Sequence, residues 1–260
     1  IKSRASIGYD KTDGLFMNKS YERFTTRFNN DIFINKFLSA TIDLNFRRVT
    51  SRAPVQDPMW WSWAAAPVYA AEWSDGRVGE GKTGENIYAS LKYGGYNNGW
   101  TNQAGGRISL DFLPVETLKI SAIVSPNLQF YKGKLFNKKV EYYDAENPAL
   151  LLGTIGGHEN TNLYENRNDS YNITIQLLAN YKKMFGDHNL NAMAGYEDYY
   201  AFYEYMGASR QQYELSSFPY LNLGPLEFRD NSGSAVENAY HSFFGRVIYD
   251  YKNKYLFQGN

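Results

Sequence analysis

The stretch DSYNITIQLLANYKK, residues 169–183, has the side-chain pattern of a long β-strand with two different faces. Successive side chains of a strand point to opposite sides, so residues two positions apart share a face. Only Leu178 breaks the alternation of apolar and polar residues. One face would carry Tyr171, Ile173, Ile175, Leu177, Ala179 and Tyr181, and the other Asn172, Thr174, Gln176, Asn180 and Lys182.

The apolar face of this segment has the height of a membrane. Tyr171 and Tyr181 are ten positions apart, and each position along a strand adds roughly 3.3 Å. Tilted by about 40°, such a strand covers about 25 Å, the apolar band of an outer-membrane barrel. Strands of soluble proteins typically span about 5–6 residues. Because Tyr favours membrane interfaces, the two terminal Tyr also indicate a strand that crosses a membrane.

Similar alternation recurs along the chain and predicts about nine strands of an antiparallel transmembrane β-barrel, all-β in class. Pro126 has no backbone N–H, so we expect the strand that starts at Leu118 to bulge or end there. Short connections alternate with long ones, as in outer-membrane barrels. The short ones are predicted near Asn30-Asp31 and at 113–117, 184–188 and 252–254, and the longer ones at about 50–103, 132–168 and 207–238, with a brief one near Asp13-Gly14.

Composition excludes several classes of protein. The 27 basic residues equal the 27 acidic ones, whereas a nucleic-acid-binding surface requires a basic surplus. There is no cysteine, so disulfides and thiolate metal sites are excluded. No run of 18 apolar residues predicts a transmembrane helix.

The last residues carry the most specific similarity to a known family. The stretch YHSFFGRVIYDYKNKYLFQGN, residues 240–260, resembles a signature of the SusC/RagA family, the TonB-dependent outer-membrane transporters of Bacteroidetes. HNLNAMAGYED (188–198) resembles the strand that follows a periplasmic turn in that family. LPVETLKISA (113–122) resembles its recurrent hairpin with Pro at the turn.

The resemblance implies that residues 1–260 are a segment of the barrel domain of a multi-pass outer-membrane protein. The plug domain, the TonB-contacting segment and the remaining strands of a barrel of about 22 strands would lie outside this chain, and a leader would precede Ile1. The implied function is import of a nutrient, an oligosaccharide or a peptide. TonB would drive the import, and a SusD-like surface lipoprotein would be the partner. Polar lumen residues would be Arg47, Arg107, Asp111, Gln176 and Arg246.

A soluble, secreted β-sandwich that binds glycans is the alternative. The mean hydropathy of −0.54 favours it. Barrel strands, however, turn one face to the polar interior and are joined by polar loops. A low mean hydropathy is therefore also expected of a barrel.

One motif points to different chemistry. GRVGEGKT, residues 76–83, fits the spacing of a phosphate-binding P-loop. That mechanism requires a buried strand before the loop and a helix after it. AEWSD precedes the motif and is not a buried strand, and NIYASLKYGG after it is a poor helix. We therefore predict a flexible Gly-rich loop that binds no nucleotide.

No catalytic or metal site is predicted. His158, His188 and His241 have no partner at metal-ligand spacing. Glu197 and Asp198 are adjacent, so on a strand they would face opposite sides and could not form an acid–base pair. We expect no enzyme activity and no cofactor.

A Trp-rich stretch, PMWWSWAAAPVYAAEW (58–73), is the candidate site for contact with substrate or partner. Exposed Trp side chains stack on sugar rings and peptide side chains, but the same residues could instead pack a long loop into a self-supporting lid. The candidate residues are Trp60, Trp61, Trp63 and Trp73.

Overall fold

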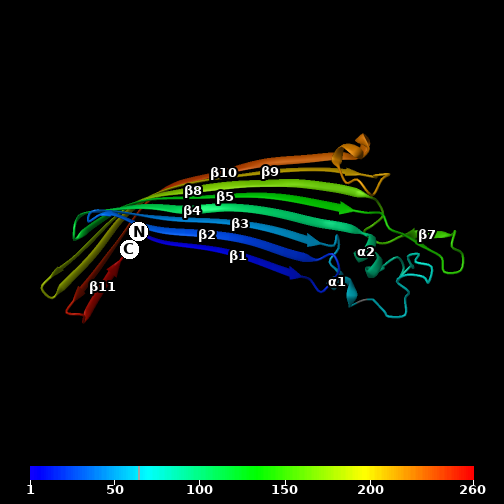
Figure 1. Ribbon diagram of the computed structural model, residues 1–260, viewed down its shortest axis with the longest axis horizontal. Helices are drawn as coiled ribbons and strands as arrows, with labels where there is room; N and C mark the ends of the chain where they lie inside the picture. The colour runs from blue at the N-terminus through cyan, green and yellow to red at the C-terminus, as the bar shows by residue number, and fades with distance from the viewer. Residues whose placement is uncertain (64) are drawn as a thin grey trace.

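The computed structural model describes residues 1–63 and 65–260, without the side chain of Trp60. Its main feature is one antiparallel sheet of nine strands, each paired with its neighbour along the chain, as predicted (Figure 1). The sheet is curved and open, with β1 and β11 at its edges. The strands are β1 (Lys2–Asp13), β2 (Ser20–Asn35), β3 (Leu38–Ala53), β4 (Gly95–Val115), β5 (Leu118–Asn137), β8 (Asn162–Phe185), β9 (His188–Gln211), β10 (Arg229–Tyr251) and β11 (Tyr255–Gly259).

The smaller elements lie at one end of the sheet, and the tight turns lie at the other (Figure 1). We call these the loop end and the turn end. Among residues 1–63 and 65–260, no helix has the length and apolar character needed to cross a membrane. The smaller elements are the helices α1 (Pro58–Ser62) and α2 (Ile87–Tyr93), the 3₁₀ turns η1 (Leu221–Leu223) and η2 (Leu226–Phe228), and a hairpin of β6 (Glu141–Tyr143) and β7 (Leu151–Thr154).

The strand register separates the sheet into an apolar face and a polar face. Residues paired across antiparallel strands point to the same side. Ile42 pairs with Ile108, Ile108 with Val124, and Val124 with Ile175, so one apolar row crosses β3, β4, β5 and β8. Large side chains on this face are exposed: Leu177 retains 51% of its accessible surface. Exposed apolar area of this extent indicates a surface that meets another apolar phase.

The predicted lumen residues all lie on the polar face. The pairs that place them there are Arg47 with Gln103, Asp43 with Arg107, Asp111 with Ser121, Gln176 with Glu197, and Arg246 with Met193.

Leu178, the exception in the 169–183 pattern, lies in a small apolar row on the polar face. It pairs with Gly195, which pairs with Phe244. A Cβ at Gly195 would lie 2.4 Å from the Phe244 ring and 3.0 Å from a Leu178 methyl group. Only glycine therefore leaves room for the two large side chains to meet across β9.

An ionisable pair lies beside Ile175 on the apolar face. Asp198 is opposite Ile175 on β8 and His241 on β10, and the His241 Nδ1 lies 3.2 Å from its Oδ1. Its neighbour Glu197 lies on the polar face, where Gln176 donates a hydrogen bond of 2.5 Å to it. Glu197 and Asp198 thus face opposite sides, as predicted.

Two predicted breaks in the strands are wrong. The turn expected near Asn30-Asp31 lies at residues 36–37, because β2 continues to Asn35, and Ile32 and Phe33 still pair with β3. β5 runs through Pro126 without a shift in register. The missing N–H faces β4, where the pairs of residues 106 and 107 are interrupted, while Pro126 keeps its place opposite Ile173 of β8.

Three further expectations change. The long loops are shorter than predicted and span residues 54–94, 138–161 and 212–228, because paired strands continue into the polar ends of each segment. Ile87–Tyr93 forms a helix, which the Asn86 side chain caps by accepting from the Ala89 N–H at 3.0 Å. The sandwich alternative is wrong, because the strands build one layer and no second sheet covers the apolar face among the described residues.

The two faces should respond differently to a new charge in the middle of β8. In the complete protein in lipid, Ile175→Arg should destabilise the fold by about 2–4 kcal/mol, because the apolar face is expected to meet lipid near the midplane. Gln176→Arg points to the polar face beside Glu197 and should cost little. Unfolding in liposomes measures both variants, and equal costs would contradict the assignment of the faces.

Candidate functional site

The polar face of β1–β4 carries a group of arginines without acidic partners. Arg27 and Arg47 are exposed and line a hollow of about 350 Å³ together with Thr25, Asn45 and Gln103. Within residues 1–63 and 65–260, no carboxylate oxygen lies within 4 Å of Arg4, Arg27, Arg47 or Arg107. Arginines with free donors favour carboxylate or sulfate groups of a ligand, because the guanidinium offers a planar fork.

The polar face of the later strands is lined with tyrosines. The rings of Tyr199 and Tyr240 stack with centroids 4.8 Å apart, and the Tyr240 hydroxyl donates to Glu197 at 3.0 Å. Tyr205 and Tyr164 share a hydrogen bond, and Tyr203 is 41% exposed. Tyrosine rings offer apolar area with a polar tip, which suits sugar rings and peptide side chains. The polar face therefore has an arginine part and a tyrosine part.

Of these residues, Arg47 and Arg107 are predicted from the sequence, whereas Arg27 and the tyrosines are not. A turn near Asn30-Asp31 would give Arg27 a different partner on β3 from the Asn45 that it has in the structure. The signal was present in YYAFYEY (199–205), where Tyr199, Tyr203 and Tyr205 recur with strand period.

The loops of residues 54–94 and 138–161 pack into one layer at the loop end. Ala89, Val140 and Ile155 form its buried core, with Val78 and Tyr142 against it. The Asn86 amide donates to the carbonyls of Ala71 at 2.7 Å and Gly79 at 2.9 Å. These buried contacts hold the loop layer together without a long regular element.

His158 is fully buried in the loop layer. Its Nε2 lies 2.7 Å from the Ser90 Oγ, and burial lowers the pKa of His158 below its ordinary value. The ring is therefore neutral at neutral pH and acts as a packed hydrogen-bonding group. No group of three or more His, Asp or Glu side chains suited to a metal ion occurs among the described residues.

The Trp residues of the predicted contact site differ in their surroundings and exposure. The Trp73 indole N–H donates to the Tyr143 carbonyl at 2.9 Å and so links the two long loops. Trp61 is 38% exposed and lines a cavity of about 310 Å³ with Leu91 and Ile155. Trp63 is 75% exposed, and the side chain of Trp60 lies outside the described residues. A packing role fits Trp73, while Trp61 and Trp63 stay predicted contact residues.

The P-loop-like segment does not form a phosphate cradle. Lys82 and Glu85 form an isolated β-bridge, with hydrogen bonds in both directions of 3.0 and 3.2 Å. The preceding residues contribute only one further bridge, Glu72 to Val78, rather than a buried strand. The geometry agrees with the prediction of a Gly-rich loop.

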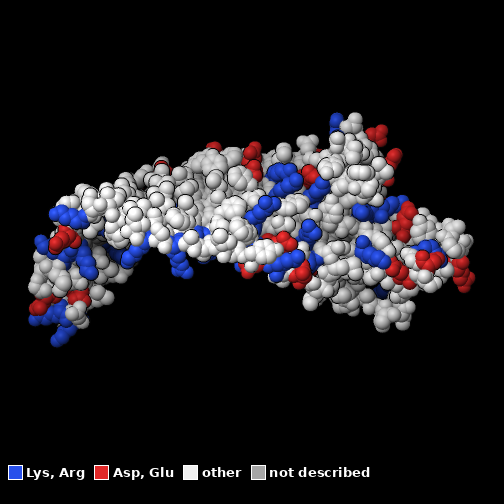
Figure 2. Space-filling model, in the orientation of Figure 1, with Lys and Arg blue, Asp and Glu red and all other residues white. Residues whose placement is uncertain are grey.

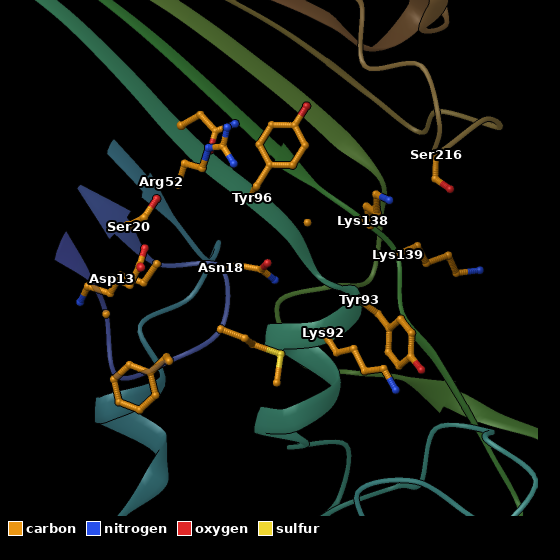
Figure 3. A pocket seen from close by; sticks show the side chains of 16 residues that line it. Asp13, Asn18, Ser20, Arg52, Lys92, Tyr93, Tyr96, Lys138, Lys139 and Ser216 are labelled. Carbon is orange, nitrogen blue, oxygen red and sulfur yellow. The ribbon is translucent and has the colours of Figure 1, made fainter. Parts of the chain in front are cut away.

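A cavity of about 790 Å³ lies at the loop end between the β1–β2 loop, the end of α2 and the start of β4 (Figure 3). Tyr96 and Arg52 both line it (Figure 3). Ser20 pairs with Arg52, and Arg52 with Asn98. Arg52 is six positions from Phe46 on β3, so this row points to the same side of the sheet as Phe46. The cavity therefore lies on the side of the apolar face, nearer the loop end than the apolar residues.

Two of the lysines that line this cavity are already paired. Glu72 accepts hydrogen bonds from Lys92 at 2.8 Å and from Tyr93 at 2.5 Å. The Lys92 bond lowers the pKa of Glu72, and the same bond raises the pKa of Lys92. Lys139 lies 2.6 Å from Glu141. Lys92 and Lys139 are therefore already engaged by carboxylates, and Arg52 is a further cation of the cavity lining.

Comparison with known proteins connects this architecture to a family. No protein-family model matches the sequence. TonB-dependent receptor P3 of Formosa agariphila is 26% identical over 271 residues, which cover 97% of this chain and 25% of the receptor. TonB-dependent receptor P39 of the same organism is 27% identical over 143 residues, 53% of this chain and 13% of that receptor. The chain is similar to a segment of a TonB-dependent receptor over nearly its whole length.

Solved structures of RagAB give the same fold for this receptor segment. The RagAB peptide transporter matches with a TM-score of 0.71 at 18% identity, covering 96% of this chain and 28% of that chain. The "closed-closed" state of the RagAB peptide importer matches with a TM-score of 0.70 at 16% identity and the same coverage. The segment thus spans about a quarter of the length of its relatives. The predictions of the family, of a partial antiparallel barrel and of an outer-membrane location are confirmed.

We expect Lys82→Ala to have no effect on nucleotide binding by the receptor. The segment has neither the strand nor the N–H cradle that holds phosphates, so neither form should bind ATP. Isothermal titration of the detergent-solubilised receptor measures this. Saturable ATP binding that Lys82→Ala abolishes would contradict the loop assignment.

We expect the Trp residues of the loop layer to differ in their effect on stability. Trp73→Phe removes the indole donor and should destabilise the loop layer by about 1 kcal/mol. Trp63→Ala, at an exposed position, should change stability by less than about 0.5 kcal/mol. Hydrogen exchange of residues 54–94 and 138–161 reports both effects. Unchanged exchange in Trp73→Phe would show that the indole does not hold the two loops together.

Proposed function

We propose that the receptor imports a nutrient across the outer membrane and that the polar face of this segment forms part of the wall of its import path. The observation that carries the proposal is the division of the sheet into a continuous apolar face and a polar face with free arginines and exposed tyrosines. In an outer-membrane barrel the apolar face meets lipid and the polar face lines the interior.

The substrate is an oligosaccharide or a peptide. Tyr199, Tyr203 and Tyr240 offer ring faces to either class, and Arg27 and Arg47 offer donors to carboxylate groups. RagAB, which shares the fold, is described as a peptide importer. This likeness of fold supports a peptide without excluding a saccharide.

A surface lipoprotein of the SusD type covers the loop end in this proposal, and the TonB complex of the inner membrane supplies the energy. The loop layer supports this role, because its core and its Trp73 bond make it a firm surface. Exposed Trp63 and partly exposed Trp61 are the candidate contact residues on it. Binding energy at interfaces concentrates in a few such aromatic side chains. The receptor acts as a transporter, with no reaction catalysed by the segment.

Uptake by a double variant of the polar face tests the proposal. Arg27→Gln with Arg47→Gln removes two charges from the import path, and uptake of labelled acidic peptides or oligosaccharides should fall roughly tenfold. The matched control is Lys11→Gln with Lys252→Gln. These lysines already pair with Glu22 at 3.6 Å and Asp187 at 3.2 Å, and exposed pairs contribute little.

Heat-modifiable mobility on a gel verifies that each variant is a folded barrel. Reduced uptake in the polar-face variant alone supports the proposal. Equal uptake in both variants, or wild-type uptake that persists without TonB, would overturn it.

A further inference from the structure

A second group of unpaired cations lies on the outer side of the sheet, where it has no part in the import path. Arg48, Lys132 and Arg167 have the strand alternation of the apolar face. Lys132 and Arg167 are directly paired across β5 and β8, and Lys132 is also paired with Trp100. We call Arg48, Lys132, Arg167 and Trp100 the outer basic patch.

The outer basic patch begins directly above the apolar band. Phe46 and Tyr171 are the last apolar residues of the band on β3 and β8, and Arg48 and Arg167 follow two and four positions further toward the loop end. At roughly 3.3 Å per residue, this places the cations about 7–13 Å along the strands from the band. In Figure 2, the middle of the visible face is largely free of charge, and charged side chains gather toward the loop end and again at the turn end.

The charges of the patch are free to bind a ligand. Within residues 1–63 and 65–260, no carboxylate oxygen lies within 4 Å of Arg48, Lys132 or Arg167, whereas the nearby Lys134 is paired with Glu165 at 3.0 Å. The Lys132 ammonium lies 5.4 Å from the centre of the Trp100 ring. The neighbouring acidic residues are Asp169 and Glu204, which pair with each other across β8 and β9. The patch has three cations against these two carboxylates, so it keeps a basic surplus.

We propose that the outer basic patch binds the phosphorylated sugar headgroup of a glycolipid in the outer leaflet of the outer membrane. Three observations determine this occupant. The patch has the strand alternation of the apolar face, it begins directly beyond the apolar band, where headgroups would lie, and its cations complement phosphate. Trp100, at the same level, offers a ring face to a sugar.

The large cavity above the patch fits the same ligand. Arg52 lies four positions beyond Arg48 on β3 and on the same side, at the edge of this cavity. The cavity also presents Asn18, Tyr93 and Tyr96 (Figure 3). Sugar units attached to the headgroup would extend away from the membrane toward it. Lipid bound here would hold β3, β4, β5 and β8 together at the membrane surface.

The test is the binding of lipid A to the complete receptor in phosphatidylcholine nanodiscs. Three probes are compared by native mass spectrometry and by the thermal midpoint of the barrel: diphosphorylated lipid A, dephosphorylated lipid A and no addition. The variant Arg48→Gln, Lys132→Gln, Arg167→Gln should bind diphosphorylated lipid A roughly 100-fold more weakly than wild type. Salt should weaken wild-type binding, because it screens the charges.

The matched control makes the same charge change on the polar face: Arg27→Gln, Arg47→Gln, Arg107→Gln. Its lipid A affinity should stay within about twofold of wild type, since these residues are on the other side of the sheet. Equal losses in both triple variants, no loss in the outer one, or equal affinity for dephosphorylated lipid A would each overturn the proposal. If the outer triple variant fails to fold, Arg48→Gln and Arg167→Gln alone should each weaken binding roughly fivefold, and unchanged binding in both would overturn it.

Discussion

The structure depends on the pairing of backbone N–H and C=O groups between neighbouring strands. In lipid an unpaired peptide group costs several kcal/mol, so a chain can cross only if every group finds a partner. Here the strands from β2 to β9 of the nine-stranded sheet each pair on both sides over most of their length. Pro126 lacks a backbone donor, but the loss is confined to one side. The pairing with β4 is interrupted at this position, while the pairing with β8 stays in register.

The continuous register converts a simple alternation in sequence into two separate chemical surfaces. A shift of one position between any two strands would put an apolar row on the polar side. The pairing keeps Ile42, Ile108, Val124 and Ile175 in one row, and the same pairing brings the arginines of β1–β4 and the tyrosines of β8–β10 to the opposite face. Departures from alternation are matched across strands, as Leu178 is by Gly195 and Asp198 by His241.

The loop end is stabilised in a different way. There, side chains such as Asn86 and Trp73 donate hydrogen bonds to backbone carbonyl groups. Small buried apolar clusters take the place of the hydrogen bonds between strands. The polar face and the outer basic patch lie on opposite sides of the same strands. In our proposals one sheet therefore presents a wall to the substrate and a wall to the headgroups, and the neighbours Arg47 and Arg48 belong to different surfaces.

The sequence by itself determined the class of fold, the membrane setting and the faces of most strands, because period-two alternation is a local property that needs no partner. Residues 169–183 predicted both a strand and its lipid side, and the polar positions Arg107 and Gln176 followed in the same way. Tertiary structure alone decided where the strands end, since pairing outweighed the turn preference of Asn30 and Asp31 and extended β9 to Gln211. It also decided which distant side chains meet. Trp73 reaches Tyr143, and Lys132 lies between Trp100 and Arg167, because the register between strands depends on the sum of all cross-strand contacts, which no single segment contains.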